Sequence, residues 1–265
     1  MTKRSPFRYF KTSPEIIRLA VMMYVRFPLS LRNVEDLLHE RGIDVSHETV
    51  RFWWNRFGPI FAAEIRQKRV TQMHAHSNWQ WHLDEIFVKI NGETHYLWRA
   101  VDHEGEVLEG FVTKRRDRKA ALKFLRKSMK RYGQPDVVVT DRLKSYGAAM
   151  KVIGNSRRQM TGRWLNIRAE NSHLPFRRRE RAMLRFRRFR SLQKFTAIHS
   201  SIHNHFNQER HLYSRANFKL QRSAALYEWR QLCSAWVPGF RSKLRLVRIC
   251  LTASCFLIFL IERNF

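Results

Sequence analysis

The order of hydrophobic patterns between residues 79 and 141 constrains the fold of this chain more than any other feature of its sequence. Three runs rich in apolar, aromatic and β-branched residues cover positions 79–90, 94–102 and 107–113, and such runs are typical of strands. The connections between them are the size of turns and contain Gly92 and Gly105, as expected for hairpins. The sequence therefore predicts three consecutive antiparallel strands.

A helix and a fourth strand follow these hairpins. Residues 117–133 carry apolar side chains at helical spacing, and Gly133 ends the pattern. The short apolar run at 136–141 is typical of a buried parallel strand. A crossover helix that joins antiparallel strands to a further, parallel one places that last strand beside the first. We therefore predict an α/β fold with the order βββαβ.

Two of the predicted strands carry acidic residues in a strongly basic protein. Asp84 lies inside the first apolar run, and Asp141 ends the last one. The chain has 51 lysines and arginines against 22 aspartates and glutamates, which gives a formal net charge of +29. A buried carboxylate is costly unless a positive partner compensates it. A basic chain indicates a polyanionic partner, so the acids raise the hypothesis of divalent cations that act on a nucleic acid.

The predicted strand order explains how these acids can share one metal site. Asp84 lies midway along the central strand and Asp141 at the carboxyl end of its parallel neighbour, and neighbouring strands are about 4.8 Å apart. Glu170 comes 29 residues after Asp141, which leaves room for a loop and the start of a helix across the sheet edge. Converging carboxylates select Mg²⁺ or Mn²⁺. Two such ions about 3.5–4 Å apart serve phosphodiester chemistry.

Each acid also has a simpler interpretation. Asp141 can merely begin a turn after a strand. Asp84 can be a structural hydrogen-bond acceptor, and Pro175 obscures where the helix near Glu170 begins. Three other acids compete for the functional role: Glu85, Asp102 and Glu180.

The segment 14–66 has the apolar spacing of helices. One amphipathic run begins at Ser30 and is broken by Gly42, and Ser46 is placed to cap the next helix. Two helices joined by a glycine-containing turn predict a helix-turn-helix, although an ordinary helical hairpin has the same pattern. The net charge favours DNA binding. The second helix would then present three polar side chains to DNA, Arg51, Asn55 and Arg56, whereas Trp53 and Trp54 are predicted to be core.

A basic segment follows the predicted catalytic strands. Apolar residues at steps of three or four predict one long helix from about residue 176 to 210. Eight arginines lie between Arg177 and Arg190 against a single acid, Glu180. They can form a solvated face, but such a density of one sign repels itself and DNA phosphates would relieve the repulsion.

Histidines and cysteines do not indicate a further metal site. Three histidines, His199, His203 and His205, flank the apolar stripe, and no clustered cysteine or acid completes a zinc site around them. The three cysteines, Cys233, Cys250 and Cys255, match no zinc spacing and fit a reducing cytosol. The first fifteen residues lack the apolar stretch of a secretory signal, so we expect a cytoplasmic protein.

Four segments together resemble a known family. They are WHLDEIFVKINGETHYLWRAVD, VVVTDRLKSYGAA, RAENSHLPFRRRERAM and HNHFNQERHLY. In this order they are similar to the DDE transposases of bacterial insertion sequences, specifically the sixth, cointegrate-forming family. The similarity extends from about residue 8 to residue 232.

The resemblance implies a ribonuclease-H-like catalytic domain whose metal-binding, catalytic triad is Asp84, Asp141 and Glu170. Arg177, seven residues after Glu170, matches the family's basic position near the cut. Further DNA contacts are expected from four basic residues: Lys144, Arg178, Arg179 and Arg181.

The expected organisation has four parts. Residues 1–70 form the helix-turn-helix domain, 76–212 the catalytic domain with the long basic helix, 213–235 a C-terminal helical end and 236–265 an atypical apolar extension. The resemblance implies binding to terminal inverted repeats, Mg²⁺- or Mn²⁺-dependent DNA cleavage and strand transfer into target DNA. It also implies a homodimer or larger homo-oligomer on DNA, at the bacterial nucleoid and without a membrane partner. The alternatives are a nuclease of the same fold that cuts without joining, and an inactive DNA-binding remnant.

The chain departs from the family in two places. Asn166 is followed by Ile167, where a second polar residue, commonly Asn, is expected, so hydrogen bonding beside Glu170 should differ. Family members end near residues 228–232, and the tail beyond is unrelated. Its longest apolar run, 249–261, is shorter than the roughly 20 residues that span a bilayer, and we interpret the tail as a frameshift or read-through extension.

Overall fold

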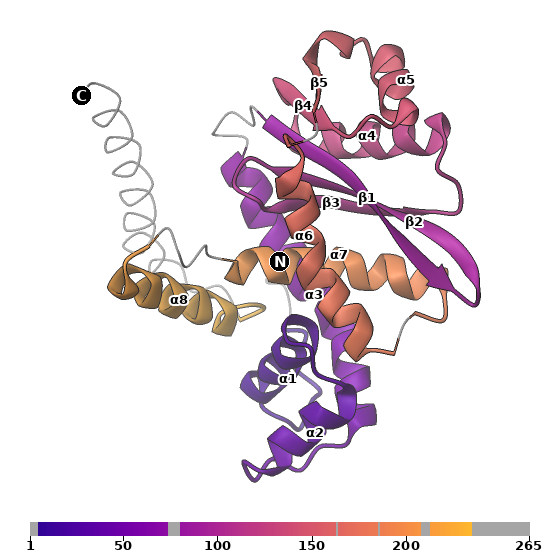
Figure 1. Ribbon diagram of the computed structural model, residues 1–265. Coiled ribbons are helices and arrows are strands. Elements are labelled where there is room, and N and C mark those ends of the chain that lie inside the picture. Colours follow the sequence, from indigo (N-terminus) through magenta and orange to yellow (C-terminus); the bar gives the residue numbers. More distant parts are fainter. Residues whose placement is uncertain (1–4, 74–79, 163, 185, 208–212, 235–265) are drawn as a thin grey trace. The chain divides into compact units, whose positions relative to one another are not determined.

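The computed structural model describes residues 5–73, 80–162, 164–184, 186–207 and 213–234 (Figure 1). Contacts within the chain separate a large unit, Phe10–Leu232, from a small one made of Met1–Tyr9 and Cys233–Phe265. All elements discussed below belong to the large unit. The apolar extension 236–265, with Cys250 and Cys255, lies outside the described residues.

A five-stranded sheet forms the centre of the large unit, with the strand order β3-β2-β1-β4-β5. The strands are β1 (Gln80–Ile90), β2 (Glu93–Asp102), β3 (Val107–Thr113), β4 (Val137–Thr140) and β5 (Gln159–Thr161). The first three pair antiparallel, and β4 runs parallel to β1 on its other side. This is the ribonuclease-H-like arrangement, and the predicted order βββαβ is confirmed. The short strand β5, parallel to β4, was not predicted.

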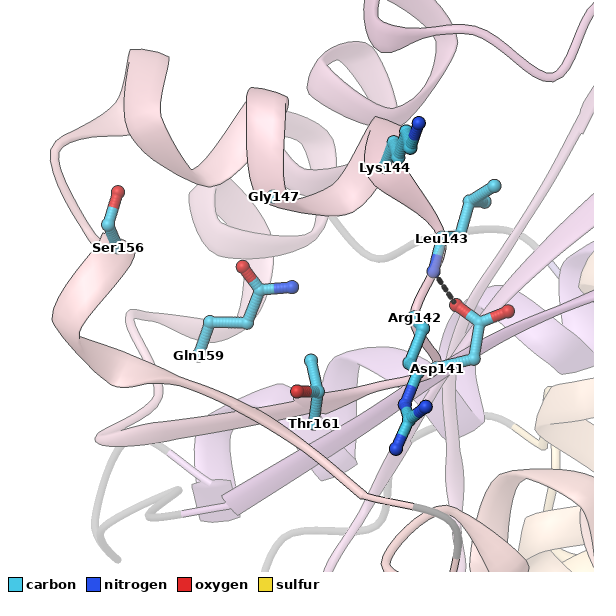
Figure 2. A pocket seen from close by; sticks show the side chains of 8 residues that line it. All are labelled: Asp141, Arg142, Leu143, Lys144, Gly147, Ser156, Gln159 and Thr161. Carbon is cyan, nitrogen blue, oxygen red and sulfur yellow. Dashed lines mark hydrogen bonds between the residues drawn. The ribbon is translucent and has the colours of Figure 1, made fainter.

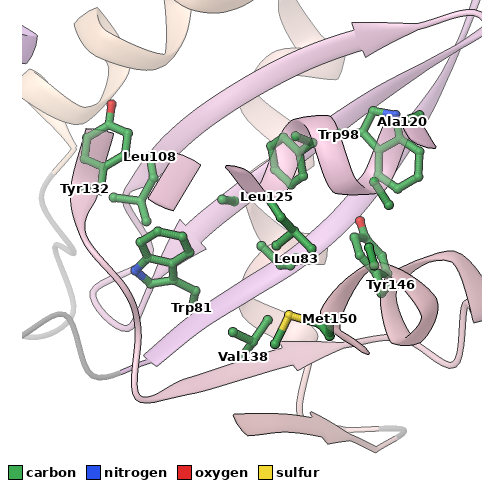
Figure 3. Close-up of a cluster of buried hydrophobic side chains, with 14 residues drawn as sticks. Trp81, Leu83, Trp98, Leu108, Ala120, Leu125, Tyr132, Val138, Tyr146 and Met150 are labelled. Carbon is green, nitrogen blue, oxygen red and sulfur yellow. The ribbon is translucent and has the colours of Figure 1, made fainter. Parts of the chain in front are cut away.

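Helices cover both faces of the sheet because the side chains of β1 alternate between them. Trp81 and Leu83 point towards α4 (Arg118–Tyr132) and α5 (Lys144–Ile153), where they pack in a buried cluster with Tyr146 (Figure 3). Ile86 and Val88 point to the opposite face, towards α6 (Ile167–Ala182) and α7 (Phe189–Phe206). Asp84 therefore shares its face of the sheet with α6.

The predicted long helix at 176–210 is wrong, because this segment forms parts of two helices. After α6, the chain turns at Leu184, whose φ of 55° is left-handed, and α7 starts at Phe189. The rings of Phe176 and Phe195 lie 6.5 Å apart in the structure. In one continuous helix, these two residues would be about 28 Å apart. The turn thus allows both helices to contribute to one apolar cluster against the sheet.

Three helices precede the sheet: α1 (Pro14–Arg26), α2 (Leu31–His39) and α3 (His47–Met73). The predicted caps are present, since Ser30 and Asn33 form a capping box and Ser46 Oγ accepts the N–H of Thr49. At 27 residues, α3 is longer than the pattern at its start suggested. It packs along α7, where the rings of Trp54 and Phe195 meet edge to face.

The last described helix, α8 (Arg215–Arg230), packs against the N-terminal helices through Trp229. The Trp229 ring meets Phe61 of α3 edge to face, and its indole N–H donates to the carbonyl of Arg18. Within the part of the chain that the structure describes, no helix is both long enough and apolar enough to cross a membrane.

The outer edge of β3 is closed by polar side chains of α7. The amide oxygen of Gln193 accepts the N–H of Val112, and its nitrogen donates to the carbonyl of Gly110. Asn204 makes the same pair of bonds with the backbone of Val107. These bonds satisfy backbone groups that would otherwise be free to pair with another strand.

Gly110 permits the close contact between β3 and α7. A Cβ atom at this position would lie 2.5 Å from Cγ2 of Thr196, which is nearer than two carbon atoms can approach. The glycine is therefore required by packing, because α7 passes directly over the edge strand.

We predict that Gly110→Ala destabilises the protein by about 1–3 kcal/mol, as overpacking does in well-packed cores. Adding Thr196→Ser removes the clashing methyl group and should restore most of the loss in a double-mutant cycle measured by urea unfolding. Gly147→Ala is the matched control, because the nearest atom to its new Cβ, Oε1 of Gln159, would lie at an ordinary 3.6 Å. Equal destabilisation by both alanines would contradict the packing argument.

Candidate active site

The sheet brings Asp84 and Asp141 together at the carboxyl end of β4. Leu83 pairs with Thr140 in the parallel ladder, and each is followed directly in the sequence by one of the two aspartates. Carboxylate oxygens of Asp84, Glu85 and Asp141 all lie within 4.8 Å of one another. This spacing lets a single divalent cation reach more than one carboxylate, provided the side chains are fixed.

Backbone hydrogen bonds fix both aspartates. Oδ1 of Asp84 accepts the N–H of Glu85 at 2.8 Å, and Oδ1 of Asp141 accepts the N–H of Leu143 at 3.0 Å. Each bond holds one oxygen and leaves the other for a different partner. Oδ2 of Asp84 lies 3.7 Å from Nε2 of His173 on α6.

The electrostatics of Asp84 indicate that a positive charge is needed beside it. Burial is the largest cause that raises the pKa of this carboxyl to about 7, and repulsion from Glu85, Asp141 and Glu170 adds to it. A hydrogen bond from the backbone of Glu85 acts in the opposite direction. A cation bound to Asp84 would favour the charged form and offset both the burial and the repulsion.

Glu170 lies near Asp84 and Asp141, but it does not belong to the group of carboxylates that lie within 4.8 Å of one another. It is on the exposed first turn of α6, and its charge is close enough to raise the pKa of Asp84. The position of α6 depends on Asn166, whose buried amide donates to the carbonyl of Leu83 at 2.9 Å. The backbone carbonyl of Asn166 also accepts the N–H of Glu170. The sequence showed that the chain departs from the family beside Asn166, but it did not reveal that Asn166 anchors α6 to β1.

Glu85, a competing candidate, has partners of its own on the opposite face of β1. Its side chain is only 2% exposed and forms an ion pair with Arg116. Its other oxygen accepts a hydrogen bond from the hydroxyl of Tyr146 at 3.2 Å. Arg116 also approaches Asp141, with 3.7 Å between Nη2 and Oδ2. Arg116 thus links β1 to the residue that follows β4, a role that the sequence analysis missed.

The other competing acids are also held in ion pairs. Asp102 contacts Arg69 at 2.6 Å and accepts the backbone N–H groups of the turn that follows β2. Glu180 is bound by Arg177 at 2.6 Å. Asp102 also belongs to a second acidic group with Glu104 and Glu106, in which Arg69 bridges Asp102 and Glu106. Asp84 and Asp141 therefore remain the best candidates for metal ligands.

Arg99 is a buried cation opposite Asp84 that the sequence analysis did not consider. The two residues face each other across the β1–β2 ladder, and Arg99 is 1% exposed. Burial lowers the pKa of Arg99 to about 10, and the charge of Asp84 opposes this change. Burial, with Arg99 and Arg177 nearby, also lowers the pKa of His173 to about 3, so this imidazole is neutral. The strand pairing was the one signal in the sequence that could have revealed Arg99.

A pocket opens beside Asp141, between β5 and the start of α5. Figure 2 shows Asp141 at its rim, with Ser156, Gln159 and Thr161 across from it. Gln159 donates to Oγ1 of Thr140, the residue before Asp141. Lys144 and Arg142 also line this pocket, so basic and polar groups adjoin the acidic pair.

The residues expected to contact DNA differ in their accessibility. Arg51, Arg56, Lys144, Arg178 and Arg181 are exposed. Arg177 is partly exposed and also donates to the carbonyl of Phe87. The side chain of Asn55 donates to the carbonyl of Arg51 and accepts from Lys194, so it is held against the protein.

Arg179 requires a correction. It is 1% exposed, and its guanidinium lies over the rings of Tyr24 and Phe195 while donating to the carbonyl of Leu29. In this position Arg179 cannot reach a phosphate. Successive arginines on a helix point in different directions, and Arg179 is the one that faces the N-terminal helices.

Of the three histidines near the end of α7, His199 is buried in the core, and His203 and His205 are partly buried. His199 stacks on Phe195 and is 2% exposed. Among the described residues, the groups spaced to hold a metal ion are the two acidic ones above, and neither includes a histidine.

A ribonuclease-H-like sheet with one carboxylate on β1 and another directly after the neighbouring β4 defines a class of enzymes that act on the phosphodiester bonds of nucleic acids. Comparison with known proteins identifies the family within this class. The family described as a DDE domain, of the IS240 transposase type, matches residues 78–209. The transposase of the insertion sequence-like element IS431mec from Staphylococcus aureus is 35% identical over 172 residues, which cover 63% of this chain and 75% of the relative. The transposase of IS257 in transposon Tn4003, also from S. aureus, is 34% identical over the same shares. The chain belongs to the DDE transposases of the sixth insertion-sequence family.

Viral integrases are among the solved structures with similarity to this chain. The catalytic core domain of HTLV-2 integrase in complex with magnesium is 14% identical, with a TM-score of 0.37 over 50% of this chain and 89% of the viral one. A chain of the simian T-cell lymphotropic virus intasome is 15% identical, with a TM-score of 0.36 over 63% of this chain and 59% of the viral one.

The contrast between Glu85 and Asp84 can be tested by stability. We predict that Glu85→Gln lowers the free energy of unfolding by about 1–3 kcal/mol, because it removes the nearest charged partner of Arg116. Asp84→Asn should cost less than about 1 kcal/mol or stabilise the metal-free protein, since it removes a buried charge with an unfavourable pKa. Denaturant unfolding in a metal chelator measures both. A larger loss for Asp84→Asn would identify Asp84 as the structural acid.

Proposed function

We propose that Asp84, Asp141 and Glu170 are the catalytic, metal-binding residues of this transposase. The observation that carries the proposal is the approach of the Asp84 and Asp141 oxygens to within 4.8 Å, at a position where burial and repulsion raise the pKa of Asp84 to about 7. Carboxylate oxygens are hard ligands that suit Mg²⁺ or Mn²⁺. Glu170 is the third ligand, and Asn166 positions the helix that carries it.

Bound divalent ions would supply the chemistry of the reaction by activating the attacking oxygen and stabilising the leaving one. The chain's own residues orient the reactants. Asp84 and Asp141 are held by backbone N–H groups, and Arg116 approaches the second oxygen of Asp141 to 3.7 Å. His173 is neutral and lies beside Asp84, so it can hydrogen-bond near the reacting groups without adding charge. Cleavage frees a 3′-hydroxyl, and the same site directs it at a target phosphodiester.

The proposed DNA surface surrounds these acids. Arg177, Arg178 and Arg181 follow Glu170 on α6, and Lys144 lines the pocket beside Asp141. The exposed Arg51 and Arg56 make the start of α3 the proposed reader of terminal inverted repeats. The enzyme would act at the nucleoid on two element ends and a target, which calls for a homodimer or larger assembly.

Joining assays separate this proposal from its alternatives. A nuclease of the same fold would cut labelled element ends in Mg²⁺ without linking them to a target plasmid. An inactive remnant would bind the ends and leave both DNAs unchanged. Only the proposed enzyme yields joined products.

We predict that Asp84→Asn, Asp141→Asn and Glu170→Gln each reduce strand transfer by at least about 10³-fold, because each removes a ligand of the metal site. Binding to the element end, measured by fluorescence anisotropy, should change less than about threefold, since the site is a small part of the DNA surface. Glu104→Gln is the matched control from the second acidic group and should retain activity. Normal strand transfer by Glu170→Gln would remove it from the triad.

Metal affinity should depend on pH because protons compete with the metal for Asp84. The folded-state pKa is raised to about 7, so the carboxyl is protonated below that pH and ionised above it. We expect the affinity for Mn²⁺ to be constant above about pH 7 and to fall by up to about tenfold per pH unit below it. Calorimetric titrations in two buffers of different ionisation enthalpy would also detect the released proton. An affinity that is flat down to about pH 5 would show that Asp84 is not a ligand.

A further inference from the structure

A second surface of the transposase has the chemistry of a polyanion site. It is a groove between α4 and α7 that runs along β3, away from the acidic pair. Phe111 and Phe189 contribute apolar surface. Four lysines line it as well: Lys119, Lys123, Lys127 and Lys194. None of the described residues that line it is acidic.

The lysines of α4 form a row on one side of the groove. Positions 119, 123 and 127 are four residues apart, so their side chains share one face of the helix. Lys119 and Lys123 are exposed, and the ammonium group of Lys123 lies 5.5 Å from the centre of the Phe111 ring. The row is about 12 Å long, a length over which one DNA strand presents roughly three or four phosphates.

Two other kinds of occupant fit the groove poorly. An added strand cannot pair along β3, because Gln193 and Asn204 already occupy its outward backbone groups. A second copy docked by the same face would bring one lysine row against another, and like charges at an interface oppose association. A polyanion relieves the repulsion within the row instead.

The ends of the groove connect it to both proposed functional regions. Lys119 lies three residues after Arg116, which contacts Glu85 and approaches Asp141. Lys194 on the opposite wall bonds the carbonyl and the side-chain oxygen of Asn55 on α3. The groove therefore lies between the acidic site and the proposed reader helix.

We propose that this groove binds the phosphate backbone of duplex DNA that extends from the cleavage site towards α3. The proposal rests on the proposed transposase function. Lys119 and Lys123 make the direct phosphate contacts. Lys127 also pairs with Glu109, and Lys194 mainly holds α7 to α3.

The test compares two double variants of α4. Lys119→Gln with Lys123→Gln removes two charges from the groove, and Arg126→Gln with Lys130→Gln removes two exposed charges of the same helix outside it. Binding to a duplex that carries the element end is measured by anisotropy over a range of salt, in a metal chelator so that no cleavage occurs. The groove variant should lower the salt slope by about 2, at about 0.9 per phosphate contact, and weaken binding at least about tenfold. The control should stay within about threefold.

Lysine acetylation of the wild-type protein gives a second measurement that needs no variant. DNA should protect Lys119 and Lys123 and leave Lys130 reactive. Equal effects of the two variant pairs, or equal protection of the three lysines, would overturn the proposal. The groove variant can instead keep the wild-type salt slope but sediment with a different oligomeric mass in the absence of DNA. That result would identify the groove as a contact between copies of the chain. Joining by the wild-type enzyme tests the transposase function separately, so the two failures are distinguishable.

Discussion

The parallel pairing of β1 with β4 determines where the chemistry of this protein can occur. Because the pairing aligns Leu83 with Thr140, the residue that follows each of them is an aspartate, and Asp84 and Asp141 lie side by side where β4 ends. A shift of the register by one residue would turn one side chain to the opposite face and separate the carboxylates. The buried residues Trp81, Leu83 and Val138 oppose such a shift, since it would remove side chains from the cluster that they form with α4 and α5. Packing of the core and alignment of the proposed metal ligands thus depend on the same interaction.

The neighbouring acids Asp84 and Glu85 have different partners. Arg116 and Tyr146 satisfy Glu85 on one face of β1, whereas Asp84 on the other face has Arg99 opposite it and a neutral His173 nearby. Burial raises the pKa of both carboxyls, but Arg116 and the hydroxyl of Tyr146 act in the opposite direction on Glu85, whereas repulsion from three neighbouring acids adds to the rise at Asp84, to about 7. This inequality between neighbouring acids is typical of functional sites, where one group is kept in an unfavourable state for its task. The alternation of side chains along a strand makes the separation possible, because adjacent residues meet different surroundings.

The sequence predicted what depends on local pattern and missed what depends on distant contacts. Strands β1 to β4 and the caps at Ser30 and Ser46 follow from hydrophobic period and turn chemistry, and so do the positions of Asp84 and Asp141. The turn at Leu184 was missed, since the apolar spacing continues across it and only the meeting of Phe176 with Phe195 shows the need for a break. Arg179 looked like its neighbours in a basic run, and its burial is a consequence of the helices that pack over it.

The contact between α3 and α7 joins the proposed recognition of DNA to its proposed cleavage. Arg66 of α3 donates to the carbonyl of Ala197 and to Ser201, while Lys194 of α7 reaches back to Asn55. Helix α7 in turn is bonded to the backbone of β3 and touches it at Gly110 without a gap for a side chain. A helix packed in this way cannot tilt without disturbing the sheet edge, because close-packed interiors transmit small displacements. Residues 10–232 accordingly form one compact unit in which the proposed reader helix and the acidic site share a single framework.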